Sequence, residues 1–133
     1  MFEAAAVLPS EIIKEAERLK SEGYRFVTLS PVEMRDGGVE VLYHFDRSLK
    51  ELNLRVRAAK GVSLPSISSV YSAAFLAENE AQDLMGIRFD GLAVDYGRTL
   101  YLEDKTQPPP LCRSSAAASV PAFAAQEGKN DQV

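Results

Sequence analysis

Residues 39–58 read VEVLYHFDRSLKELNLRVRA, and this stretch decides the fold class. Apolar side chains alternate with polar ones on both sides of a turn at 46–48, a pattern typical of half-buried antiparallel strands. We therefore predict two consecutive strands of a meander, over 39–45 and 52–58. Their apolar members are Val39, Val41, Tyr43 and Phe45 in the first strand and Leu52, Leu54, Val56 and Ala58 in the second.

The segment before this meander predicts a strand over 3–7, a helix after Ser10 and a strand over 24–29. Ser10 is expected to cap the helix at its amino end, and Gly23 is expected to end it. The helix prediction depends on apolar residues at helical spacing, which are Ile12, Ile13, Ala16 and Leu19.

The segment after the meander predicts a second helix over 72–85, which stops at Gly86, and two short strands over 87–89 and 99–102. Consecutive strands with two separate helices indicate an α+β fold. We expect a mainly antiparallel sheet with both helices packed on one of its faces.

Composition divides the chain into two parts, a folded domain over 1–106 and a tail over 107–133. The tail begins near three consecutive prolines at 108–110 and is rich in alanine and serine. Large apolar residues are sparse in it, so we expect it to be extended or disordered.

Charge and cysteine content exclude several classes of function. The chain has 133 residues and a net charge of −4, which argues against a general nucleic-acid binder. No apolar run approaches the roughly 20 residues that span a bilayer, so we expect no direct membrane insertion. The single cysteine, Cys112, excludes an internal disulfide and a cysteine-rich zinc or iron–sulfur site.

The second predicted helix carries the carboxylates Glu78, Glu80 and Asp83 near an apolar stripe. Glu78 and Glu80 point about 160° apart on a helix, so they cannot act on one substrate atom as acid and base. Carboxylates at the borders of an apolar stripe suit the recognition of arginines, on a partner or on the same chain. The alternative is a solvated amphipathic helix packed on its own sheet. The stripe consists of Ala74, Ala77, Ala81, Leu84 and Met85.

Two other functions stay open at this point. A small stand-alone enzyme would use Glu80 or Asp83 together with His44, the only histidine, as acid–base groups. This alternative predicts a pocket in which His44 reaches one of these carboxylates. The other alternative is a free-standing adaptor or regulatory protein.

Residues 78–87, ENEAQDLMGI, resemble the signature of the 30 kDa subunit family of respiratory complex I. Asn79 stands in place of the usual arginine, and Leu92 in place of the usual histidine or lysine. The pattern resembles more closely the short homologues in energy-converting, membrane-bound nickel–iron hydrogenases or in related complexes of the formate-hydrogenlyase type. The matching positions, which the resemblance marks as signature or subunit-interface residues, are Glu78, Glu80, Asp83, Leu84, Met85 and Gly86.

This resemblance implies a non-catalytic, peripheral subunit on the cytoplasmic side of a membrane-associated oxidoreductase. It implies docking on a large catalytic subunit, hydrogenase-like or of the 49 kDa type, beside a small iron–sulfur subunit. It further implies that the chain binds no flavin, nickel or iron–sulfur centre, and that the nickel–iron and iron–sulfur centres reside in the partner subunits.

Overall fold

A computed structural model describes residues 4–98 and 100 of the chain. Its main sheet has the strand order β1-β4-β3-β2. The pairs β2–β3 and β3–β4 are antiparallel, and β1 lies parallel to β4, so the sheet is mixed but mainly antiparallel. The α+β prediction is confirmed. The strands are β1 (Ala4–Val7), β2 (Arg25–Glu33), β3 (Val39–Arg47) and β4 (Lys50–Ala58).

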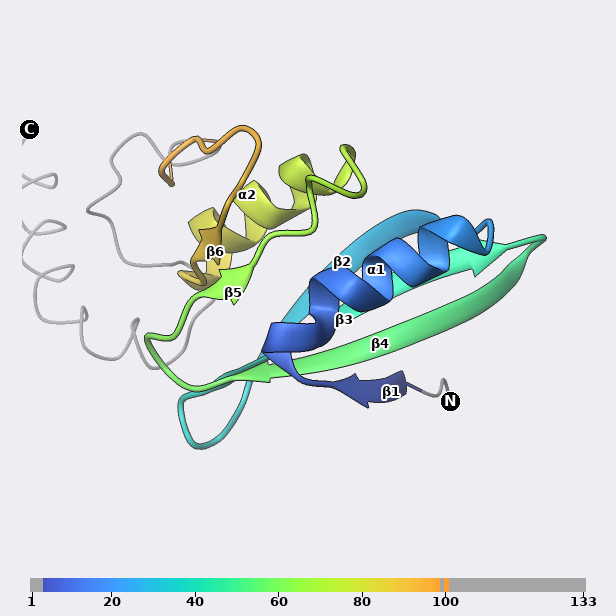
Figure 1. Cartoon of the computed structure of the whole chain (residues 1–133). Helices are drawn as coiled ribbons and strands as arrows, with labels where there is room; N and C mark the ends of the chain where they lie inside the picture. The colour runs from blue at the N-terminus through green and yellow to red at the C-terminus, as the bar shows by residue number, and fades with distance from the viewer. Residues whose placement is uncertain (1–3, 99, 101–133) are drawn as a thin grey trace, which may run out of the picture.

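The helix α1 (Ile12–Ser21) crosses one face of the sheet (Figure 1). The prediction that Ser10 caps it is wrong, because Pro9 starts a 3-10 turn, η1 (Pro9–Glu11), that takes Ser10 into helical conformation. Neither η1 nor α1 has a side-chain cap. The predicted stop at Gly23 is confirmed, since its φ of 88° lets the next amide bond the Leu19 carbonyl at 2.9 Å.

The strands of the two hairpins are longer than the sequence predicts. Strand β2 continues through Pro31, beyond the predicted end at residue 29, because it is an edge strand in which a missing N–H is tolerated. Strands β3 and β4 extend to a two-residue loop, Ser48 and Leu49, rather than to a turn at 46–48. Both loop residues have positive φ, as a tight hairpin of the type I′ kind requires.

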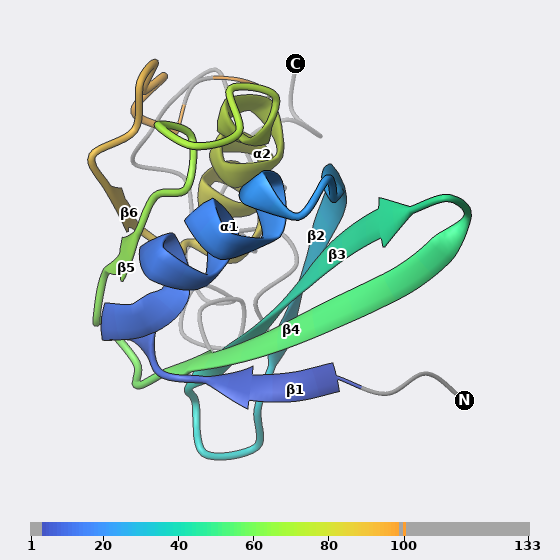
Figure 2. The same ribbon diagram turned by 45° about the vertical axis from the view of Figure 1, so that its right-hand side comes forward.

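The second helix, α2 (Ala74–Met85), lies on the same side of the sheet as α1 (Figure 2). It starts two residues later than predicted, and Gly86 ends it in the left-handed conformation as predicted. Two short parallel strands, β5 (Leu64–Pro65) and β6 (Phe89–Asp90), lie beside α2 (Figure 1). The strand predicted over 87–89 corresponds to β6.

Some predictions fall outside the part of the chain that the structure describes. They are the strand at 99–102, of which only residue 100 is described, the tail over 107–133 and the environment of Cys112. Over residues 4–98 and 100, no helix has the length and apolar character needed to cross a membrane.

The core fills the space between the helices and the sheet. The strand side chains predicted to share one face, including Val41, Tyr43, Phe45 and Val56, are fully buried there. Tyr71, from the segment before α2, packs its ring on Phe45 with centroids 5.5 Å apart. The meander pattern therefore identified the core-facing side of the sheet correctly.

Candidate functional site

Four of the five polar residues of α2 are buried, which the sequence did not indicate. Glu78, Asn79 and Asp83 have no exposed surface, and Gln82 retains 5%. The expectation that the carboxylates lie at the surface borders of an apolar stripe is therefore wrong for Glu78 and Asp83. For Glu78 the physical reason is that the segment over 64–71 covers this side of the helix and supplies a hydroxyl and a backbone amide as hydrogen-bond donors.

Glu78 accepts hydrogen bonds from two groups of the segment that contains β5. The Ser66 hydroxyl donates to one carboxylate oxygen at 2.6 Å, and the Ile67 amide donates to the other at 3.0 Å. Ser66 and Ser68 are joined through their hydroxyls at 2.8 Å, and the Ala93 amide donates to Ser68 at 2.9 Å. Glu78 thus terminates a chain of hydrogen bonds that connects three segments.

Burial raises the pKa of the Glu78 carboxyl to about 7, although the bonds from Ser66 and Ile67 oppose this. The nearby phenol of Tyr43 is also buried, and its hydroxyl has no hydrogen-bond partner among the described residues. Desolvation, followed by the negative charge of Glu78, raises the pKa of Tyr43. The two side chains therefore form a buried titratable pair between α2 and β3.

Asn79 holds the loop that follows β6. Its amide nitrogen donates to the Val94 carbonyl at 2.7 Å, and its oxygen accepts from the Tyr96 amide at 2.9 Å. The same nitrogen also donates to the Phe75 carbonyl at 2.8 Å. One side chain thereby satisfies three backbone groups, two of them in the loop, and fixes the backbone on either side of residue 95.

Gln82, one helical turn after Asn79, also bonds the segment that follows α2. Its oxygen accepts from the Phe89 amide at 3.1 Å, and its nitrogen donates to Asp95 at 3.1 Å. Arg98 then reaches the carboxyl end of α2, where its Nε donates to the Gln82 carbonyl at 3.1 Å. A cation at this position also complements the negative end of the helix dipole.

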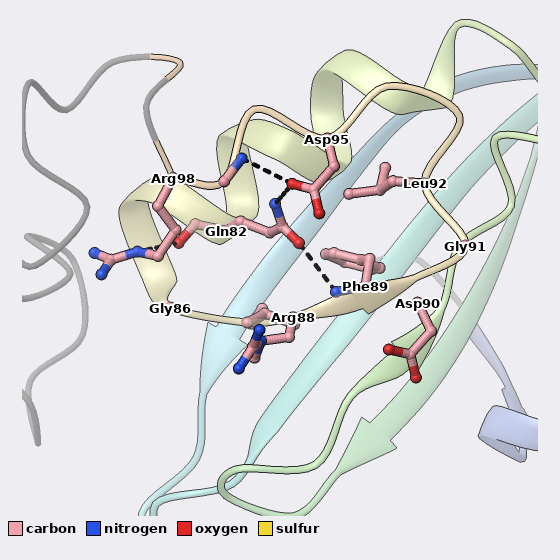
Figure 3. Close-up of a pocket in the computed structure, with 11 residues that line it drawn as sticks. Gln82, Gly86, Arg88, Phe89, Asp90, Gly91, Leu92, Asp95 and Arg98 are labelled. Carbon is pink, nitrogen blue, oxygen red and sulfur yellow. Dashed lines mark hydrogen bonds between the residues drawn. The ribbon is translucent and has the colours of Figure 1, made fainter.

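Between these attachments lies a groove at the end of α2, with a volume of about 710 Å³. Figure 3 shows Gln82 in its middle, bonded to Phe89 on one side and turned toward Asp95 on the other. The size is in the range of pockets that receive ligands or side chains. The described residues that line it are Gln82, Gly86, Ile87, Arg88, Phe89, Asp90, Gly91, Leu92, Asp95, Gly97 and Arg98.

The other predicted site residues have different exposures. Glu80 is exposed and Leu84 is half-buried, whereas Met85 is 8% exposed and packs in the core. Gly86 lines the groove and has a φ of 73°. The signature therefore combines internal residues with an outward-facing pair, Glu80 and Leu84.

His44 lies on the sheet face opposite Tyr43 and Phe45, away from the helices. Its ring nitrogens contact the Ser30 hydroxyl at 3.0 Å and the Asn53 side-chain oxygen at 2.6 Å. Because α2 packs on the other face, the fold does not bring His44 together with Glu80 or Asp83. The arrangement that the acid–base alternative requires is thus not formed.

Within residues 4–98 and 100, no group of three His, Cys, Asp or Glu side chains is placed to hold a metal ion. Asn79, Gln82 and Asp95 were missed as site residues by sequence reasoning. A signal existed for two of them: amide side chains three positions apart on a helix share a face.

Comparisons with known proteins show which family this chain resembles and support its fold. The model of the family described as "Respiratory-chain NADH dehydrogenase, 30 Kd subunit" matches residues 5–119. The C subunit of the NADH-quinone oxidoreductase from Jannaschia sp. (strain CCS1) is 35% identical over 108 residues, which are 71% of this chain and 52% of that protein. The protein of the same name from Methylobacterium sp. (strain 4-46) is 30% identical over 105 residues, which are 68% of this chain and 49% of that protein.

The chain thus spans about half the length of the curated relatives it matches. Among solved structures, a chain of the membrane-bound sulfane sulfur reductase, an archaeal respiratory membrane complex, matches with a TM-score of 0.65. The match covers 79% of this chain and 66% of that one, at 18% identity. At this identity the likeness supports the fold.

Proposed function

The chain belongs to the family of the 30 kDa subunit of respiratory-chain NADH dehydrogenase, and on this basis we propose that it is a non-catalytic subunit of a multisubunit oxidoreductase. The family match over residues 5–119 is the observation that carries this proposal. The named relatives, which are C subunits of NADH-quinone oxidoreductases, support it.

The complex that we propose is membrane-associated, either an energy-converting nickel–iron hydrogenase or a complex I-like enzyme. The chain would lie peripherally on the cytoplasmic side and be held there by partner subunits. In support of the hydrogenase type, Asn79 and Leu92 depart from the usual signature of the respiratory proteins.

The direct partners in this proposal are a large catalytic subunit, hydrogenase-like or of the 49 kDa type, and a small iron–sulfur subunit. The nickel–iron and iron–sulfur centres belong to those partners. This chain supplies a shaped surface on which the large subunit packs, and electrons and protons are handled by its neighbours.

The buried and exposed signature residues have separate roles in this proposal. Glu78, Asp83, Met85 and Gly86 keep α2 and its covering segments in place, because they are internal or define the helix end. Glu80 and Leu84 face outward and are therefore the signature side chains that can contact the large subunit.

Co-expression tests this function directly. The tagged chain is produced together with the large and small subunits encoded near its gene, and the captured material is analysed for subunits, nickel and iron. We expect all three subunits in one complex, with the metals absent from the chain purified alone. A lone chain that carries a tightly bound cofactor or shows turnover would contradict the proposal.

A further inference from the structure

Two carboxylates, Asp90 and Asp95, line the groove at the end of α2, and the two oxygens of Asp95 differ in environment. One oxygen of Asp95 accepts from the Gln82 side chain at 3.1 Å and from the Gly97 amide at 2.8 Å. The second oxygen accepts no hydrogen bond from the residues that the structure describes, and in Figure 3 it points toward the side of the groove that Phe89 and Leu92 line. The carboxylate is thus fixed in orientation, with one oxygen directed into the groove.

No lysine or arginine forms an ion pair with Asp95 in the part of the chain that the structure describes. Arg98 is turned toward the carbonyls at the end of α2, and Arg88 points away from Asp95 on the opposite wall (Figure 3). A fixed negative charge beside apolar side chains therefore lacks a complement. A basic side chain matches this arrangement, because its aliphatic stem packs on apolar surface while its charged head reaches a carboxylate.

We propose that this groove receives a lysine or arginine side chain of the large partner subunit, with its charged head on the free oxygen of Asp95 and its stem along Leu92, which is half-buried. This inference rests on the proposed function, because it names a contact within that complex. The loop after β6 would then form a second contact with the partner subunit, in addition to the contact made by the exposed side chains of α2.

Two substitutions of Asp95 distinguish the effect of its charge on binding from its effect on the conformation of the loop. Asp95→Asn keeps an oxygen that accepts both loop hydrogen bonds and exchanges the free oxygen for an uncharged amide. Asp95→Glu keeps the charge and shifts the carboxylate by one methylene, which strains the loop. Glu17→Gln is the matched control, because it removes one negative charge from an exposed position of α1.

The experiment measures the affinity of each full-length variant for the purified large subunit by titration. Asp95 is exposed in the chain itself, and the partner would cover the charge pair. We therefore expect Asp95→Asn to weaken binding about tenfold and Glu17→Gln to bind as the unmodified chain does. Asp95→Glu is expected to bind more tightly than Asp95→Asn. A purely structural role of Asp95 predicts the reverse order, since the amide preserves the loop better.

The outcomes distinguish this inference from the proposed function. If the unmodified chain binds the large subunit and Asp95→Asn binds equally well, or better than Asp95→Glu, the groove contact is wrong while the function stands. If the unmodified chain does not bind at all, the proposed function fails and the groove contact with it.

Discussion

The side-chain amide of Asn79 and the backbone carbonyl of Val94, fifteen positions apart in the chain, are joined by a hydrogen bond of 2.7 Å. Through this bond and its counterpart to the Tyr96 amide, α2 determines the path of the loop that borders the groove. A helix residue is thus responsible for the shape of a surface that it does not itself form, since Asn79 has no exposed area.

Replacing Asn79 by alanine is expected to destabilise the fold by about 2 to 3 kcal/mol, because it removes three hydrogen bonds made by a fully buried side chain. Urea unfolding measures this loss, and hydrogen exchange at the Tyr96 amide should become faster. The control is Lys14→Ala on the exposed side of α1, which should change stability by less than about 0.5 kcal/mol. Equal effects of the two substitutions would show that the amide attachment contributes nothing.

The pKa of Glu78 predicts how stability depends on pH. The folded chain keeps a proton on this carboxyl up to pH about 7, whereas the unfolded chain loses it near the ordinary value of 4.5. The folded state therefore binds more protons between these values, and the free energy of unfolding falls as pH rises through this interval. The difference between the pKa of Glu78 in the folded and in the unfolded chain corresponds to a loss of about 3 kcal/mol in the free energy of unfolding. This loss is complete above pH about 7.

Glu78→Gln tests this dependence, because glutamine retains an oxygen for the Ile67 amide but does not titrate. Urea unfolding of both proteins at pH about 5 and about 8 should show a steeper loss of stability in the unmodified chain. Parallel pH profiles for the two proteins would mean that Glu78 titrates normally in the fold.

Gly86 occupies a left-handed position, with φ 73° and ψ 15°, at the end of α2. Gly86→Ala is expected to cost about 1 kcal/mol, because a Cβ is unfavourable in this conformation. Gly86→Asn should cost less, since asparagine tolerates the left-handed region. Thermal unfolding of the two variants checks this order, and an alanine variant as stable as the glycine protein would contradict it.

Glu80→Gln tests whether the exposed Glu80 contributes to partner binding and not to stability, in contrast to the buried Glu78. Because Glu80 is exposed, its replacement should change the free energy of unfolding by less than about 0.5 kcal/mol. Binding to the large subunit should nevertheless weaken severalfold, as measured by titration calorimetry. Unchanged binding would remove Glu80 from the proposed contact surface.

The fold was largely predictable because its strands and helices follow simple periodicities. The alternation over 39–58 identified the core face, and the glycines at 23 and 86 marked both helix ends correctly. Strand β2 was predicted too short because Pro31 indicates a break, and only its place at the sheet edge makes the proline tolerable.

The candidate site was less predictable, because it depends on contacts between distant segments. Helical geometry placed Glu78 and Glu80 on different sides of α2, but it could not show that residues 64–71 bury Glu78. Asn79 was recognised only as a departure from a family pattern, and its role became visible with the loop that it holds. Partners supplied by remote backbone groups leave no local trace in a sequence.

We have proposed that this chain is a non-catalytic subunit that binds the large subunit of an oxidoreductase. Sedimentation velocity of the chain mixed with the large subunit is the most direct test. The two purified proteins are mixed at micromolar concentration and analysed in low and in moderate salt. We expect a single species that contains one copy of each protein, with no redox activity from the chain alone. Two separate boundaries under both salt conditions would contradict it.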